Sequence, residues 1–164
     1  MEGGKLKRVV SGGQTGVDRA ALDAARAAGV PIGGWCPKGR WAEDGTIPES
    51  YPLQETPSAD PLVRTTWNVR DSDGTLILHL GGPLRGGTAQ TEKAARRLRK
   101  PCLVLALDRP ADALAQEIAQ WLKAQNIRVL NVAGPRESQA PGIYHRAYDV
   151  LTALFRVLAA RSDG

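Results

Sequence analysis

Strand-like and helix-like segments alternate along the whole chain, and this order limits the folds that it can adopt. Short apolar segments typical of strands occupy residues 6–11, 30–35, 75–80, 102–107 and 127–132. Helical patterns follow at residues 18–28, 62–69, 88–99, 111–125 and 143–160. Because parallel strands are joined by crossover helices, the order predicts an α/β fold. We expect a three-layer, Rossmann-like, doubly wound and mainly parallel sheet of five or six strands.

The length and composition predict one domain. The chain has 164 residues, of which 42% are hydrophobic and 24% charged, enough for a single buried core over residues 1–164. Residues 36–60 are rich in proline, glycine and charge, so we expect a long loop there with an edge strand at residues 51–55. No uncharged apolar run approaches the roughly 18 residues that cross a bilayer, and residues 1–8 do not resemble a signal peptide. These features predict a soluble, cytoplasmic protein without membrane contact.

Charge and cysteine content narrow the function classes. The net charge of +5 suits anionic small molecules as well as nucleic acid. The basic residues between Lys93 and Lys100 lie at a predicted helix end and indicate a solvated face, so no specific nucleic-acid partner is expected. Cys36 and Cys102 lie far apart without a CxxC motif, which excludes a zinc finger and a disulfide scaffold. Cys36 is the only thiol near the expected ligand edge, but burial as a small hydrophobe is its favoured interpretation, and no metal site is assigned.

Glycine-rich loops follow the predicted strands at their carboxyl ends. The 18 glycines make up about 11% of the chain against a typical ~7%, which favours tight turns where backbone meets ligand. In open parallel sheets, ligands bind at the carboxyl edge, beside the point where the strand order reverses. The loops therefore predict a ligand site at this edge.

The first glycine loop, residues 11–18, has the sequence SGGQTGVD between a predicted strand and a helix. Its glycines allow a tight turn that exposes amide N–H groups beside the positive end of the helix, so phosphate is the expected occupant. The GGxxG spacing differs from GxGxxG, and the second strand ends without an acidic residue for a ribose hydroxyl, which disfavours ordinary NAD binding. A tight turn capped by Asp18 is the alternative. The candidate ligand-binding residues are Gly12, Gly13, Gln14, Thr15, Gly16 and Asp18.

The second glycine loop, residues 81–88, has the sequence GGPLRGGT. It matches the P-loop spacing GxxxxGKT except that Gly87 replaces the lysine, which argues against triphosphate hydrolysis. A backbone cradle remains, with a hydroxyl at the start of a helix and an arginine within the loop; a glycine-rich connection without ligand is the alternative. The candidate ligand-binding residues are Gly81, Gly82, Arg85, Gly86, Gly87 and Thr88. Because this fold places both loops side by side, we expect one elongated, phosphate-bearing ligand.

Two further segments supply candidates. Arg136, after the last predicted strand, is either an anion contact or a surface pair with Glu137. Lys38 and Arg40 lie beside Trp41 in the long loop, which is either a lid that stacks on a ring or a solvated loop. The two histidines, at positions 79 and 145, are expected to be core and surface residues respectively, and no nucleophile elbow is present.

Four motifs carry a family resemblance. The segments SGGQTGVDR at residues 11–19, NVRDSDGT at 68–75, GGT at 86–88 and LNVAGPRES at 130–138 together resemble the putative molybdenum carrier family. That family is close to the molybdenum-cofactor carrier proteins, within a wider Rossmann-like group that includes the lysine-decarboxylase-like proteins. The likeness runs from about residue 8 to residue 158. It implies a Rossmann-like fold, homo-oligomers that are often tetramers, and storage or transfer of the molybdenum cofactor, with molybdoenzymes as partners.

The implied ligand agrees with the loops. The molybdenum cofactor (molybdopterin with its metal) is a pterin with a dithiolene-bound molybdenum and a terminal phosphate, so it is elongated, anionic and partly flat. Glycine amides are suited to its phosphate or molybdate oxygens. Trp35, Trp41 and Trp67 are the aromatic candidates to cover the pterin, or else core residues. The resemblance implies a carrier without chemistry of its own.

An enzymatic alternative comes from the same wider group. It contains phosphoribohydrolases that cleave nucleoside monophosphates and whose loop resembles PGGxGTxxE. Here Thr91 stands at the position of the catalytic glutamate, and Glu92 follows one residue later, about 100° around a helix. This departure disfavours hydrolysis, so no catalytic residue is assigned.

Overall fold

The computed structural model describes residues 5–163 and contains a five-stranded parallel sheet. The strands are β1 (Arg8–Val10), β2 (Ile32–Gly33), β7 (Gly74–His79), β8 (Cys102–Ala106) and β9 (Val129–Ala133). Their order across the sheet is β2-β1-β9-β7-β8, so the last strand along the chain lies between the first and the seventh. The predicted α/β fold with a doubly wound parallel sheet is confirmed.

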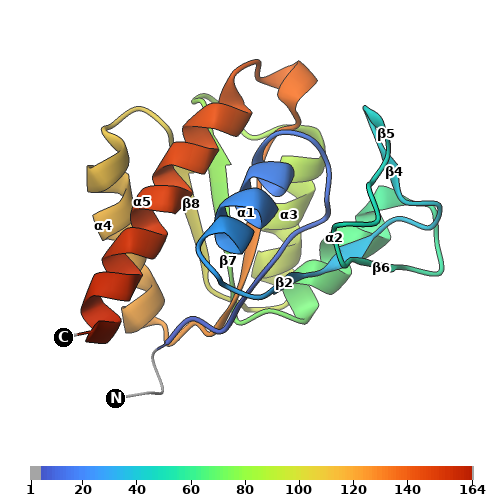
Figure 1. Ribbon diagram of the computed structural model, residues 1–164. Helices are drawn as coiled ribbons and strands as arrows, with labels where there is room; N and C mark the ends of the chain where they lie inside the picture. The colour runs from blue at the N-terminus through green and yellow to red at the C-terminus, as the bar shows by residue number, and fades with distance from the viewer. Residues whose placement is uncertain (1–4, 164) are drawn as a thin grey trace.

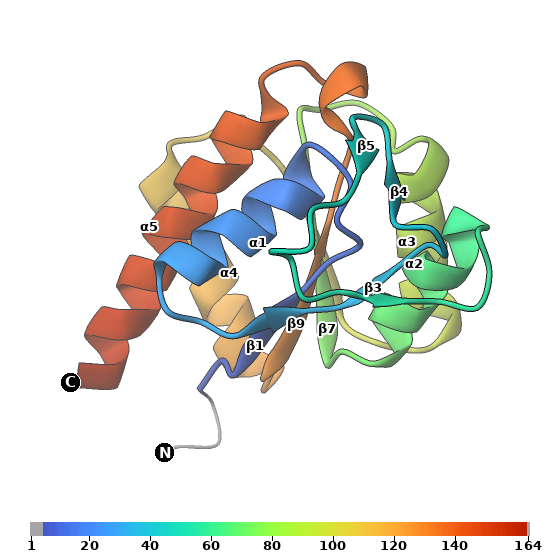
Figure 2. The same cartoon turned by 45° about the vertical axis from the view of Figure 1, so that its right-hand side comes forward.

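Helices cover both faces of the sheet, which gives three layers (Figure 1). One layer contains α1 (Val17–Ala27), α4 (Ala111–Ala124) and α5 (Ile143–Asp163), and α5 packs against both of the others. The other contains α2 (Pro61–Arg70) and α3 (Gly86–Arg97), as the rotated view in Figure 2 also shows. Within residues 5–163, none of the helices combines the length and hydropathy needed to span a bilayer.

The two faces of the sheet differ in polarity. Leu76, Leu78 and Leu130 are fully buried in the main core with α1, α4 and α5. Alternate residues of a strand point to opposite faces. Next to these leucines the strands carry Thr75, which precedes Leu76, and Asn131, which follows Leu130. Asn131 Nδ2 donates to Thr75 Oγ1 at 3.2 Å, and both residues are buried. The face toward α2 and α3 therefore has polar groups beneath it.

Residues 36–60 form a segment that we term the flap. It contains a hairpin of β4 (Trp41–Ala42) and β5 (Gly45–Thr46), and β6 (Gln54–Glu55), which pairs with β3 (Trp35–Cys36). The strand expected at residues 30–35 is divided at Gly34, which has a φ of 128° and whose added Cβ would lie 2.3 Å from the Ser11 oxygen. The chain turns away from the central sheet at this close approach. The edge strand expected at 51–55 is reduced to β6, outside the central sheet.

The chain reverses its direction of winding between β9 and β7. The connections after β1 and β9 lead to α1 and α5 on one face, whereas the connection after β7 leads to α3 on the other. Adjacent strands whose connections leave on opposite faces open a crevice at their carboxyl ends. The fold thus creates a site beside the ends of β9 and β7.

Candidate functional site

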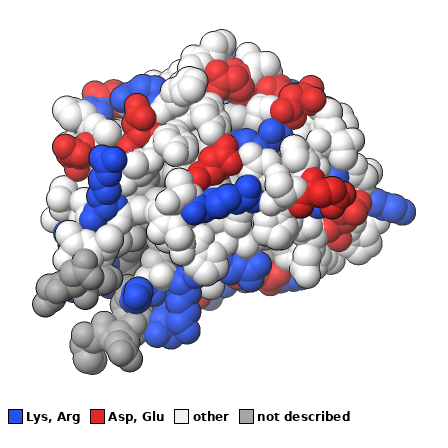
Figure 3. Space-filling model, viewed as in Figure 1, with Lys and Arg blue, Asp and Glu red and all other residues white. Residues whose placement is uncertain are grey.

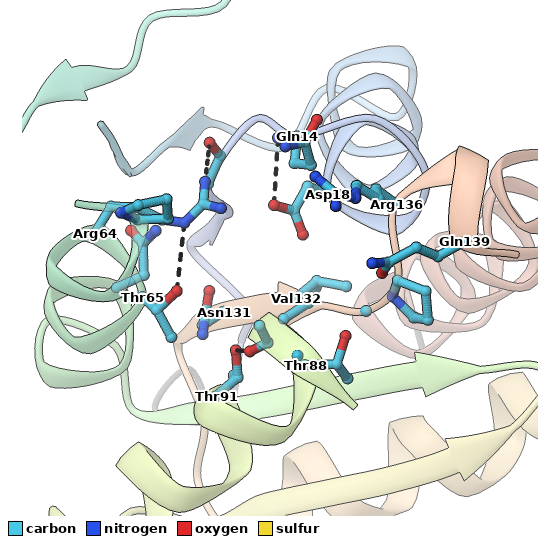
Figure 4. Close-up of a pocket in the computed structure, with 18 of the residues that line it drawn as sticks. Gln14, Asp18, Arg64, Thr65, Thr88, Thr91, Asn131, Val132, Arg136 and Gln139 are labelled. Carbon is cyan, nitrogen blue, oxygen red and sulfur yellow. Dashed lines mark hydrogen bonds between the residues drawn. The ribbon is translucent and has the colours of Figure 1, made fainter. Parts of the chain in front are cut away.

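One cavity of about 280 Å³ opens at this switch point (Figure 4). Its walls come from four parts of the chain: the first glycine loop, helix α2, the start of α3 and the residues after β9. Trp41 of the flap also lines it and is 51% exposed. Residues from both glycine loops therefore meet in one cavity.

The start of α3 contributes unpaired backbone donors. Within the described residues 5–163, the N–H groups of Gly86, Gly87 and Thr88 have no hydrogen-bond acceptor. All three residues line the cavity, and first-turn N–H groups of a helix point beyond its N-terminus. No side chain caps this end, because the N-cap residue Arg85 makes no capping hydrogen bond. The end of α3 is thus open to an anion.

Arg64 places a positive charge in the same cavity. Its Nη1 donates to the Gly12 oxygen at 2.9 Å and its Nε to Thr65 Oγ1 at 3.3 Å, while Nη2 has no acceptor within residues 5–163. Helix α2 is held in place by Asn68, which donates to the Trp35 oxygen at 3.0 Å and accepts from the Trp35 N–H at 2.8 Å. The guanidinium is therefore positioned by the first loop and keeps free donors.

Asp18 is the one acidic residue among the cavity-lining residues. It lies in the first turn of α1, is 8% exposed, and its Oδ2 accepts from the Gln14 N–H at 3.3 Å. Burial raises the pKa of the Asp18 carboxyl to about 6, although Arg64 lowers it through its positive charge. A carboxylate in this position is therefore costly and poorly solvated.

Glu43 fastens the flap to the cavity rim. Its carboxylate accepts from Thr15 Oγ1 at 2.5 Å, from Ser138 Oγ at 2.5 Å and from the Ser138 N–H at 3.1 Å. These hydrogen bonds, led by those from the Ser138 and Thr15 hydroxyls, lower the pKa of Glu43 below its ordinary value of 4.5. Gln14 Oε1 adds a further bond by accepting from the Glu43 N–H at 2.9 Å. Glu43 joins flap, first loop and the segment after β9.

The structure brings together only some of the residues proposed from the sequence. The candidates that line the cavity are Gly12, Gln14, Asp18, Gly86, Gly87, Thr88 and Arg136. The candidates outside its lining are Gly13, Thr15, Gly16, Lys38, Arg40, Gly81, Gly82 and Arg85.

Arg40 has a structural position within the flap. It is 8% exposed, and its guanidinium donates to main-chain oxygens of Ile47, Pro48, Tyr51 and Leu53 at 2.9–3.0 Å. Its side-chain donors are thus engaged by the flap itself. Lys38 is exposed and bonds through its main chain to Ser58.

Sequence reasoning missed the contribution of α2. Arg64, Thr65 and Asn68 line the cavity, and their spacing places them on one face of the helix. That polar face, in a helix beside the ligand edge, was the available signal. Asn131 and Gln139 also line the cavity without having been predicted, as does Thr91, which the sequence marked only as the residue at the hydrolase glutamate position.

The other chemistry-bearing side chains lie elsewhere. Trp35 and Trp67 pack edge to face at 4.8 Å and do not line the cavity. Cys36 is buried and not in the lining. No group of three histidine, cysteine or carboxylate side chains suited to a metal ion occurs among residues 5–163. On the face shown in Figure 3, acidic and basic side chains are interspersed over the upper and central parts.

Comparison with known proteins agrees with this architecture. Residues 9–155 match the family model described as the circularly permutated YpsA SLOG family. The chain is similar to a crystal structure of a putative molybdenum carrier protein from Syntrophus aciditrophicus SB, with 49% sequence identity and a TM-score of 0.87. The alignment covers 91% of this chain and 94% of that one. No curated protein matches the sequence significantly.

Proposed function

The chain belongs to the circularly permutated YpsA SLOG family, and from this membership and the cavity we propose that it is a cytoplasmic carrier of the molybdenum cofactor. The ligand is a phosphate-bearing pterin–molybdenum compound, bound without chemical conversion. The similar protein from Syntrophus aciditrophicus SB, named as a putative molybdenum carrier, supports a molybdenum-related role. Homo-oligomers and transfer to molybdoenzymes stay predictions of the resemblance.

The observation that carries this proposal is the convergence of anion-binding groups in one cavity. The unpaired N–H groups of Gly86, Gly87 and Thr88 lie at the positive end of a 12-residue helix. Arg64 adds a charged donor to the same lining. Such a set suits the oxygens of a phosphate or a molybdate group.

The remaining walls suit the rest of such a ligand. Trp41 offers an exposed indole at the rim, where a flat ring can stack. The cavity, of about 280 Å³, leaves room beside Arg64 and the α3 amides for a ligand longer than the phosphate alone. These residues fit a phosphate-bearing ring compound. The proposed ligand brings the dithiolene and oxygen ligands of its own metal, so no residue of this chain is assigned to the metal.

The enzymatic alternative has weaker support. Thr91 lines the cavity at the position of the hydrolase glutamate, and its Oγ1 donates to the Gly87 oxygen at 2.9 Å. Glu92 is outside the lining and lies 3.8 Å from Arg96 in an i,i+4 pair. We therefore expect no release of free base from nucleoside monophosphates. Steady turnover that Glu92→Gln abolishes would favour the hydrolase.

Mass spectrometry of small molecules retained by the natively purified protein tests the carrier proposal. We expect a phosphate-bearing pterin from the wild type and much less from Gly87→Val. The added side chain enters open space in the cavity wall and displaces the ligand rather than the fold, since no heavy atom lies within 4 Å of its Cβ. A retained nucleotide would favour the alternative, and retention of neither compound would contradict both.

A further inference from the structure

The Asp18 carboxylate has one oxygen without a partner. Oδ2 accepts from the Gln14 N–H, and the Gly12 N–H also lowers the pKa of the carboxyl, but within residues 5–163 no hydrogen bond ends on Oδ1. Asp18 is 92% buried and lines the cavity. In Figure 4 its carboxylate projects into this cavity, opposite Thr88. An accepting oxygen that opens into the cavity without a protein donor is available to an N–H donor of a ligand.

Asp18 conflicts with a purely anionic ligand. The other charged side chains of this lining are cations, Arg64 and Arg136, the latter 3.5 Å from Glu43, and the unpaired α3 amides are donors. A free phosphate gains from those groups but is repelled by a carboxylate in the same confined space. The arrangement suits a ligand that carries its anionic oxygens at one end and N–H donors at the other.

We propose that Asp18 determines the specificity of the cavity by accepting N–H donors from the ring of the ligand. The chemical class is a phosphate-bearing heterocycle with adjacent amino and ring N–H groups, as on the 2-amino-4-oxo edge that pterins and guanine share. The α3 amides hold the phosphate, and Asp18 Oδ1 holds the ring edge. The inference rests on the proposed function, because it concerns the same cavity.

The fold contacts of Asp18 do not need its outer oxygen. Ser11 Oγ donates at 2.9 Å to the main-chain oxygen of Asp18, not to its carboxylate. An asparagine at this position keeps an oxygen for the Gln14 N–H, and its NH₂ replaces the free acceptor by a donor. Asp18→Asn is therefore a near-isosteric exchange that alters ring recognition and leaves the loop contacts in place.

Calorimetric titration with matched probes tests the proposal. GMP and IMP differ only in the 2-amino group, and ribose 5-phosphate lacks the ring. We expect the wild type to bind GMP at least about tenfold more tightly than IMP. Only GMP offers both the ring N–H and the 2-amino group as donors. In Asp18→Asn the two affinities should fall within about twofold of each other. Ribose 5-phosphate should bind the variant at least as tightly as the wild type, because the repelling charge is gone. Glu92→Gln is the matched control: it removes one carboxylate charge outside the cavity and should behave as wild type.

A second pair of probes identifies the source of the ring. Pterin and lumazine carry the same bicycle, but lumazine has a second oxo group in place of the amino group. Preference for pterin over lumazine, together with tighter binding of a pterin phosphate than of GMP, assigns the edge to a pterin. The reverse order assigns it to a guanine nucleotide.

The outcomes separate this inference from the proposed function. Equal wild-type affinities for GMP and IMP, and for pterin and lumazine, would overturn the role of Asp18, whatever the variant does. Phosphate probes would still bind in that case, and the anion site would stand. A preference that survives in Asp18→Asn would assign the acceptor to another group, such as Asn131. Failure of every phosphate probe to bind would remove the proposed function, while the pterin–lumazine pair would still test Asp18.

Discussion

The first glycine loop, residues 11–18, is buried except at Thr15, whereas the second, residues 81–88, is largely exposed except at Leu84 and Thr88. In the first loop an added Cβ at Gly16 would lie 2.4 Å from the Pro135 oxygen. In the second loop no heavy atom lies within 4 Å of a Cβ at any glycine.

The contrast shows that one sequence signal serves two physical purposes. Glycine in the first loop permits close packing of backbone against the segment after β9 and against the flap. The glycines of the second loop are not required by close packing of this kind. Three of its four glycines, at positions 81, 82 and 86, adopt positive φ, and Gly87 leaves the helix end accessible. The glycines of the first loop serve packing, although its Gln14 and Asp18 side chains line the cavity. Gly86 and Gly87, at the end of the second loop, instead leave a helix end open to the ligand.

The largest expected effect is on stability. Gly13 has a φ of 79°, and an added Cβ would lie 2.6 Å from Leu53 Cδ1, so Gly13→Val combines backbone strain with overpacking. We expect it to lower the free energy of unfolding by about 4 kcal/mol. Gly87→Val, without either problem, should change it by less than about 1 kcal/mol. Urea denaturation measures both, and equal losses would contradict the distinction between the loops.

The different environments of Gly13 and Gly87 decide which variant can test ligand binding. From the sequence alone, Gly13 and Gly87 are both candidate ligand-binding residues, so valine at either position would be expected to test ligand binding. Because the first glycine is required by packing, only the second variant is a clean probe of the ligand.

The second effect concerns the pH dependence of stability. The pKa of Asp18 is raised from 3.8 to about 6, so the folded state favours the neutral acid. The associated stability is fully present below about pH 4 and is lost as the pH rises through 6. Relative to the wild type, Asp18→Asn should gain about 2–3 kcal/mol between pH 4 and pH 8.

Thermal or urea unfolding across this pH range checks the prediction. Arg64 and Arg19 are the charged groups that oppose the shift, and both remain in the variant. Asp44→Asn, at an exposed carboxylate of the flap, should show no such gain. A difference that stays constant with pH would show that burial does not penalise the Asp18 charge.

The third prediction concerns ligand affinity, which a substitution in the second loop should change without changing stability. Gly87→Val should weaken binding of a phosphate-bearing ligand at least tenfold, or about 1.4 kcal/mol, because a side chain covers the free amides. Gln90→Val, at an exposed position of α3 outside the cavity lining, is the matched control and should bind normally. Normal binding by Gly87→Val would place the phosphate elsewhere.

The sequence predicted the parallel sheet, the order of strands and helices and the edge at which the cavity lies, because these depend on local periodicity and short loops. It did not predict the division of one strand at Gly34, which results from close approach to Ser11, distant in the chain. Arg40 illustrates the same limit. Its basic sequence context indicated a ligand contact, but its four oxygen partners lie on a folded flap that no local pattern reveals. Arg64 was missed because its position depends on the carbonyl of Gly12.

The smallest expected effect concerns Glu43, which contacts the first loop but not the second. Replacing its carboxylate in Glu43→Gln weakens the charge-assisted bonds from Thr15 and Ser138, and we expect a loss of about 1 kcal/mol at pH 7. Because the pKa of Glu43 is lowered in the folded protein, its stabilisation exists above pH 4.5 and disappears as the pH falls below that value. Hydrogen exchange should quicken at the Ser138 amide, which donates to Glu43, and stay unchanged at residues 89–92 of α3. Glu92→Gln, an exchange of the same kind on α3, should leave the Ser138 amide protected. Faster exchange in α3 would mean that the flap contact also orders the start of that helix, and the two loops would then be one mechanical unit.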